Sequence, residues 1–215
     1  MNASPRGPRG LLIIVLSTVL GLAAGAAWQW LRQPPPPPAD LAATMFPQPR
    51  PLPEGFRLTD QDGRPLDAAR LRGKWTFVFF GFTHCPDVCP TTLTVMARLK
   101  KMLAAGPDPA PVQMLFVSVD PKRDTPEVLK RYVTFFDPEF LGATAPMERL
   151  VPMTRSLGIL FAYNNQGRDD GGYTVDHSAQ ILLFSPEAQW VAVFGTPHVA
   201  ARMARTFRQI RSYYE

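Results

Sequence analysis

A long stretch of apolar residues, Leu11 to Leu31, lies near the start of the chain and contains no charged residue. A helix of about 20 residues rises roughly 30 Å, which matches the hydrocarbon core of a bilayer. Trp28 and Trp30 fall at one end, where aromatic side chains favour the membrane interface. Arg6 and Arg9 precede the other end, so the positive-inside rule predicts a cytoplasmic N-terminus and places the bulk of the chain outside the cytoplasm.

A cleaved signal peptide is the rival interpretation, because the small residues from 23 to 27 offer a possible cleavage site. The run is longer than a usual signal core, so we predict a cytoplasmic segment at 1–10 and a retained transmembrane anchor at 11–31. Under both interpretations, the rest of the chain is exported from the cytoplasm. The short basic start is not an Arg- and Ser-rich presequence, which favours a single-pass protein of a bacterial inner membrane with a periplasmic domain.

Five consecutive prolines, Pro34 to Pro38, follow the apolar stretch. Such a run favours extended polyproline II and forms a semi-rigid spacer. We therefore predict a proline-rich linker of irregular structure at 32–53 and a folded domain at 54–215. That domain is long enough to bury a full hydrophobic core.

Within the domain, the apolar pattern predicts strands and helices in alternation. Short runs of aromatic and β-branched residues are typical of buried strands, and apolar residues spaced three and four apart are typical of helices. The predicted elements are a hairpin at 56–66, strands at 74–82, 112–119, 159–163, 180–185 and 190–194, and helices at 91–103, 126–136, 147–157 and 197–210.

This order predicts an α/β domain with a thioredoxin-like fold, preceded by one N-terminal transmembrane helix. The helix and polar loop between residues 140 and 176 are interpreted as insertions on that fold. The two last strands are expected to form an antiparallel edge of the sheet.

The charge balance narrows the class of partner. The net charge is +5, from 23 basic and 18 acidic residues, and the excess is scattered along the chain. Nucleic-acid binding calls for a clustered basic stripe, so we expect no nucleic-acid partner.

The two cysteines, Cys85 and Cys89, are the only ones in the chain. A structural disulfide framework spreads several cysteines along a sequence, and one close pair restrains little of the unfolded chain. The pair directly follows a predicted buried strand, where the chain turns into a helix. Free N–H groups and the partial positive charge at a helix N-terminus favour thiolate over thiol. The pair is therefore predicted to be redox-active or metal-binding.

Two thiolates on one turn suit Cu(I) or Zn(II). A closed zinc site calls for four protein ligands, which two cysteines and three histidines supply less economically. His84 is adjacent to Cys85 and points another way, and His198 is expected to cap the last helix or face solvent. His177 precedes a core strand, at a junction that faces the cysteine turn in a thioredoxin-like fold, and is the candidate third ligand.

Two carboxylates are candidates for supporting this site. Asp176 could accept the second N–H of the His177 ring, as acceptors beside metal-bound imidazoles do, or it could be a turn residue. Asp120 lies at the end of a core strand, near the predicted site.

Three motifs together resemble the Sco/SenC family: GFTHCPDVCP at 81–90, VDPKRDTP at 119–126 and VDHS at 175–178. The resemblance extends from about Pro53 to the C-terminus. It implies a thioredoxin fold that binds one Cu(I) or Cu(II) through Cys85, Cys89 and His177. It also implies an upstream copper donor and a role in building the CuA centre of cytochrome c oxidase subunit II, or in loading another copper acceptor. The turn at 186–189 departs from the family in having no glycine.

Several functions remain open on these residues. The first is a copper metallochaperone. The second is a membrane-anchored thiol–disulfide oxidoreductase, in which Cys85 and Cys89 are a catalytic redox pair that reduces the cysteines of the copper acceptor. A peroxidase would not explain a histidine facing the cysteine pair, and a structural disulfide is disfavoured by the short loop.

Overall fold

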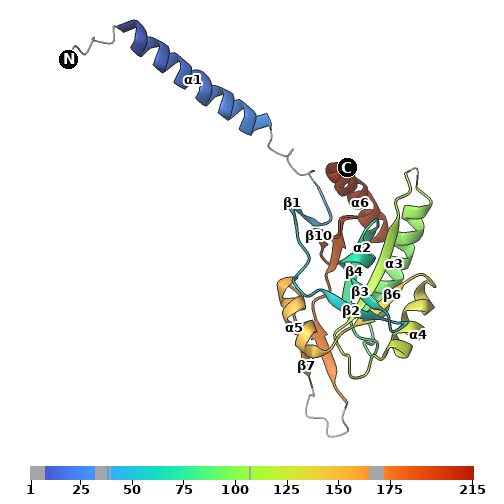
Figure 1. The fold of residues 1–215 in the computed structure, drawn as a ribbon. Coiled ribbons are helices and arrows are strands. Elements are labelled where there is room, and N and C mark those ends of the chain that lie inside the picture. The colour runs from blue at the N-terminus through green and yellow to red at the C-terminus, as the bar shows by residue number, and fades with distance from the viewer. Residues whose placement is uncertain (1–7, 32–37, 39, 107, 165–171) are drawn as a thin grey trace. The chain divides into compact units, whose positions relative to one another are not determined.

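The computed structural model describes residues 8–31, 38, 40–106, 108–164 and 172–215 (Figure 1). The chain divides into two compact units, Met1–Pro36 and Pro37–Glu215. The first contains helix α1, Pro8–Leu31. Its segment Leu12–Leu31, with a mean hydropathy of 1.8, is long and apolar enough to cross a membrane. Both a membrane anchor and a signal sequence have these properties. Residues 34–37 of the proline run lie outside the described residues.

An eight-stranded sheet forms the frame of the second unit, in the order β1-β10-β9-β4-β5-β6-β2-β3. Strands β4, β5 and β6 are parallel, and the remaining pairs are antiparallel. The strands are β1 Thr44–Arg50, β2 Arg57–Asp60, β3 Pro65–Asp67, β4 Trp75–Gly81, β5 Val112–Ser118, β6 Leu141–Thr144, β9 Ile181–Phe184 and β10 Trp190–Phe194. A separate two-stranded sheet pairs β7, Phe161–Asn164, with β8, Thr174–His177.

The described residues of the unit also form the helices α2 Ala68–Leu71, α3 Val88–Ala104, α4 Pro126–Phe136, α5 Met147–Ser156 and α6 Ala200–Tyr214. Thr125 caps α4, because its side chain accepts a hydrogen bond from the N–H of Val128 and Pro126 occupies the first turn. Gly158, with a φ of 67°, follows the end of α5 in the left-handed conformation that glycine adopts without strain.

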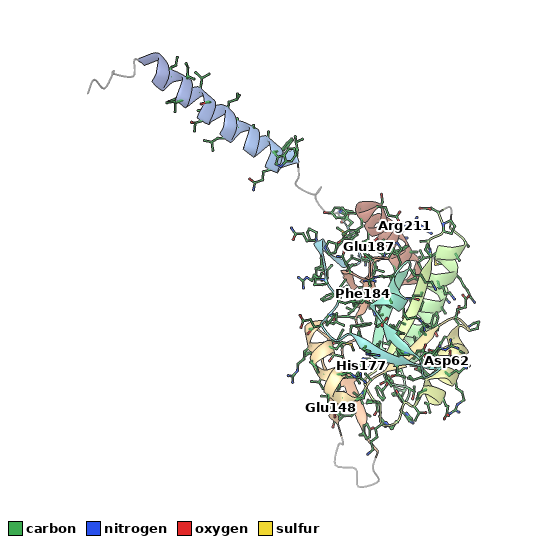
Figure 2. All side chains as sticks on the ribbon, in the orientation of Figure 1. Asp62, Glu148, His177, Phe184, Glu187 and Arg211 are labelled. Atoms are coloured by element: carbon green, nitrogen blue, oxygen red, sulfur yellow. The ribbon has the colours of Figure 1, made fainter. Side chains whose placement is uncertain are left out.

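Side chains of β4 alternate between two hydrophobic cores, one on each face of the sheet. Phe77 and Phe79 pack with α3, α4 and α6, whereas Val78 and Phe80 pack with α2 and α5. A strand covered on both faces reads as a continuous apolar run, which explains its sequence. Figure 2 shows the side chains that fill both layers, with Phe184 of β9 fully buried among them.

The alternating α/β order and the thioredoxin-like layout are confirmed, and two features of the sheet differ from the prediction. Residues 44–50, expected to be irregular linker, form β1 and pair with β10. Strand β10 is therefore not the edge of the sheet. The prolines of β1 suggested irregular chain, but an edge strand tolerates residues that lack an N–H because one side of it needs no ladder bonds.

The short elements α2, β6 and β8 were not predicted. Each has only four residues, which is too few to establish a hydrophobic period. The turn at 186–189 that lacks a glycine places Ala188 at a φ of 60°, in the left-handed region that favours glycine.

Candidate metal centre

The two cysteines lie where β4 leads into α3. Cys85 is in the connecting loop and Cys89 is in the first turn of the helix. Asp87 provides no side-chain cap for α3, and the backbone N–H of Cys89 instead points to the sulfur of Cys85 at 3.4 Å. A helix N-terminus has N–H groups without partners inside the helix, so the Cys85 sulfur satisfies one of them. This contact holds both cysteines on one side of the turn.

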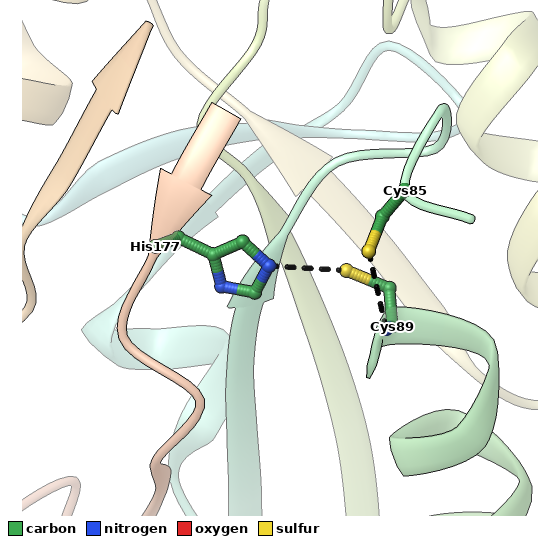
Figure 3. A group of neighbouring side chains, drawn as sticks. All are labelled: Cys85, Cys89 and His177. Atoms are coloured by element: carbon green, nitrogen blue, oxygen red, sulfur yellow. Dashed lines mark hydrogen bonds between the residues drawn. The ribbon is translucent and has the colours of Figure 1, made fainter. Parts of the chain in front are cut away.

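His177, the last residue of β8, completes the group. Its Nε2 lies 3.3 Å from the sulfur of Cys89, and its Nδ1 lies 3.1 Å from the carbonyl oxygen of Ser178. A proton on Nδ1 that is donated to this carbonyl leaves the Nε2 lone pair facing the sulfurs (Figure 3). Phe79 and Phe82 contact the imidazole edge-on, with ring centroids 5.9 and 6.0 Å away.

The candidate donor atoms of Cys85, Cys89 and His177 all lie within 4.8 Å of one another. Cys89 is buried, while Cys85 and His177 are half-buried. Neither cysteine forms a disulfide. Two soft sulfurs and one imidazole nitrogen form a donor set that suits copper. A structural zinc site has four protein ligands, one more than this group supplies.

The cysteine pair shares one proton unequally. The hydrogen bond from the Cys89 thiol, supported by backbone N–H groups at the start of α3, holds the pKa of Cys85 far below its ordinary value. The same hydrogen bond and burial raise the pKa of Cys89. Cys85 is therefore the thiolate, and binding a metal to both sulfurs displaces the proton of Cys89.

Alkylation of the apo protein tests this assignment. Thiolate persists at every pH above the pKa of Cys85, so its rate of reaction with iodoacetamide should be nearly constant from about pH 8 to about pH 5. An ordinary thiol, with a pKa of about 8.5, should lose close to tenfold in rate for each pH unit over this range. The Cys89→Ala variant removes the thiol donor but keeps the backbone N–H groups, so its rate should begin to fall at a higher pH than in the unmodified protein. An ordinary dependence in the unmodified protein would contradict the assignment.

Gly81 ends β4 directly beneath the cysteines. A Cβ added here would lie 2.5 Å from the Cys89 sulfur and 2.9 Å from Cε2 of Phe116. Both distances are too short, so the absence of a side chain at this position makes room for the sulfur.

The Gly81→Ala variant should therefore be destabilised by about 1–3 kcal/mol and should bind copper more weakly, because the Cys89 sulfur must move. Denaturant unfolding and copper titration measure the two effects. Gly195→Ala is the matched control, since a Cβ there meets nothing within 4 Å. Equal behaviour of the two variants would show that the contact with the sulfur is unimportant.

Asp176 and Asp120, the two carboxylates that were predicted to support the site, lie in different surroundings. Asp176 is exposed, and the acceptor beside Nδ1 of His177 is the Ser178 carbonyl. Asp120 is fully buried, and its side chain pairs with Arg123 and accepts a hydrogen bond from Tyr173.

The two other histidines lie outside the group of donors. His84 is exposed beside Thr83, with its Nδ1 3.1 Å from the hydroxyl oxygen. The Nε2 of His198 lies 2.7 Å from the carbonyl oxygen of Ala179. This contact holds the segment that follows His177. The position of His198 near the start of a helix did not predict it.

Comparisons with known proteins agree with this geometry. The SCO1/SenC family model matches residues 46–212. The mitochondrial SCO2 homologue of Bos taurus is 33% identical over 209 residues, which cover 97% of this chain and 78% of that protein. A putative copper-binding protein of Stutzerimonas stutzeri is 38% identical over 143 residues, covering 66% of this chain and 68% of that protein.

Two solved structures share the fold. The crystal structure of Arabidopsis thaliana ScoI with copper bound is 34% identical and has a TM-score of 0.68, covering 74% of this chain and 97% of that one. Yeast Sco1 with copper bound is 29% identical and has a TM-score of 0.70, covering 77% of this chain and 91% of that one. The family match covers most of the sequence and includes all three candidate ligands, so this chain belongs to the SCO1/SenC family.

Proposed function

We propose that this protein is a copper metallochaperone that holds one copper ion through Cys85, Cys89 and His177. The observation that carries the proposal is the convergence of these three donor atoms within 4.8 Å from two distant segments of the chain. Copper-bound structures of relatives with 34% and 29% identity support the choice of metal. The acceptor we propose is the CuA site of cytochrome c oxidase subunit II.

Each donor has a distinct task in binding the copper cargo. The Cys85 thiolate is half-buried and ionised, so it is the sulfur that meets an incoming Cu(I). Cys89 then binds with loss of its proton, which leaves two thiolates on the metal. His177 offers an imidazole nitrogen, which suits Cu(II) better than two sulfurs alone do. Release occurs when thiolates of an acceptor replace these ligands from the exposed side of Cys85.

Thiol–disulfide exchange is a second candidate function of the same residues. The observation that favours it is the asymmetry of the pair, with one half-buried thiolate beside one buried thiol. An accessible thiolate of low pKa attacks a disulfide, and its neighbour then resolves the mixed disulfide. In this role the protein would reduce the cysteines of the copper acceptor without using His177.

We further propose that α1 is a retained anchor, with residues 1–10 in the cytoplasm and the folded unit that contains β1 as the periplasmic copper-binding domain. The length and apolar composition of Leu12–Leu31 support a membrane span. A fractionation experiment with alkaline extraction distinguishes a retained anchor from a cleaved signal peptide. A retained anchor keeps the protein in the membrane pellet at its full length, and a cleaved signal releases a shortened chain.

Copper titration of the reduced protein, followed by transfer to an apo CuA domain, tests the proposed function. We expect one copper per chain and its movement to the acceptor on mixing. Absence of uptake would contradict the metallochaperone. Uptake without transfer, together with reduction of an acceptor disulfide, would instead favour the oxidoreductase.

A further inference from the structure

The loop that follows β5, residues 119–124, contacts both of the segments that carry the candidate ligands. The cysteines and His177 come from segments that are far apart in the sequence, so something must fix the distance between them. This loop is attached at one end to the cysteine loop and at the other to the hairpin that ends in His177.

Asp124 makes the attachment to the cysteine loop. Its carboxylate is fully buried and accepts hydrogen bonds from the backbone N–H of Thr83 at 2.9 Å and from the Thr83 hydroxyl at 2.6 Å. The hydroxyl of Ser118, at the end of β5, donates to the same carboxylate at 2.5 Å. Thr83 is two residues before Cys85, so these bonds join the cysteine loop to the end of β5.

The attachment of the histidine strand depends on side chains. Among the described residues, β7 and β8 pair only with each other and form no ladder with the eight-stranded sheet. Tyr173, directly before β8, is held at three points. Its hydroxyl donates to Asp120 at 2.7 Å, its carbonyl accepts from Nη1 of Arg123 at 3.0 Å, and its ring lies 3.6 Å from the Arg123 guanidinium carbon.

Arg123 is the centre of this arrangement. It forms an ion pair with the fully buried Asp120, which orients its planar guanidinium. The guanidinium carbon also lies 5.6 Å from the ring of Phe82, and that ring contacts the imidazole of His177 edge-on. Arg123 therefore acts on His177 by two routes, through the backbone of β8 and through an aromatic ring.

We propose that Arg123, clasped between Asp120 and Tyr173, is a positioning residue that holds Nε2 of His177 toward the two sulfurs. The inference rests on the proposed function, because the position of His177 affects copper binding only if His177 is a ligand. Loss of the contacts of Arg123 should weaken Cu(II) binding most, because Cu(II) depends more on the imidazole nitrogen. Cu(I) held by two thiolates should depend on it little.

Two variants of the full-length protein test the proposal. Arg123→Met removes the clasp, and Tyr173→Phe removes only the hydroxyl bond to Asp120 while keeping the ring. We expect Arg123→Met to weaken Cu(II) binding by about 10–100-fold, the range seen when groups that orient ligands are lost. We expect a smaller loss in Tyr173→Phe, altered Cu(II) electron paramagnetic resonance in both, and Cu(I) affinity within about threefold. Lys122→Met is the matched control, since it removes the exposed cation next to Arg123.

Hydrogen exchange of the apo protein gives a readout that does not involve copper. Amides of residues 174–177 should exchange faster in Arg123→Met than in Lys122→Met, while those of β4 and β5 should not change.

Unchanged Cu(II) binding and exchange in Arg123→Met would overturn the proposal. So would equal losses of Cu(I) and Cu(II) affinity that follow a loss of global stability. If Arg123→Met does not fold, Tyr173→Phe decides by the same measurements. Failure of the unmodified protein to bind copper would defeat the proposed function first, and the exchange data would still decide whether the clasp holds β8.

Discussion

The double variant Cys85→Ser, Cys89→Ser is expected to lose stoichiometric Cu(I) binding. Serine oxygen is a hard, protonated donor, so the variant keeps the shape of both side chains and removes the soft thiolates that Cu(I) selects. Competition against a chromophoric Cu(I) chelator measures the loss. The unmodified protein should withdraw one equivalent of Cu(I) from the chelator, and the variant should withdraw none.

The fold of this variant should survive. Neither cysteine forms a disulfide, so no crosslink is lost. Cys89 is fully buried, and a hydroxyl there costs about 1–3 kcal/mol if it lacks a partner. Nε2 of His177, 3.3 Å from the sulfur, can accept its hydrogen bond, so we expect a loss near the lower end. Thr91→Ser, in the exposed part of the same helical turn, is the control. Retained Cu(I) uptake by a folded double variant would contradict the assignment of both cysteines.

His177→Ala is expected to separate the two oxidation states. It should weaken Cu(II) binding by at least about 100-fold, or about 2.7 kcal/mol, because the only nitrogen donor of the group is lost. Cu(I) affinity should change by less than about tenfold, because two thiolates remain. Competition titrations with chelators for each oxidation state measure both values.

His84→Ala is the matched control for this variant. His84 is adjacent to Cys85 but exposed and outside the donor group, so its removal should leave both affinities unchanged. If His84→Ala weakened Cu(II) binding as much as His177→Ala did, the third donor would not be His177. If His177→Ala had no effect on Cu(II), the metal would be held by the cysteines and other atoms.

The sequence alone supported much of this account, for physical reasons that differ between elements. The aromatic run of β4 and the apolar face of α3 are long enough to show their periods, and the cysteine pair falls between them. His177 was placed by the family motif and by its position before a core strand. The structure brings it to the cysteines through β8, a strand too short and too polar to be predicted.

The supporting residues were harder to foresee because they depend on contacts between distant segments. Asp176 is next to His177 in the sequence, yet its side chain faces solvent and a backbone carbonyl takes its expected place. Arg123 belongs to a motif that carried the family resemblance, but no local pattern shows that its partner is Tyr173, 50 residues away. Such pairings depend on the tertiary structure and cannot be predicted from the spacing of apolar residues along the sequence.

X-ray absorption at the copper edge of the loaded, full-length protein tests the central claim most directly. With one copper per chain, the Cu(II) form should show two sulfur donors and the outer-shell scattering of one imidazole, and that imidazole signal should disappear in His177→Ala. A spectrum with fewer than two sulfurs, or an imidazole signal that persists in His177→Ala, would contradict a site built from Cys85, Cys89 and His177.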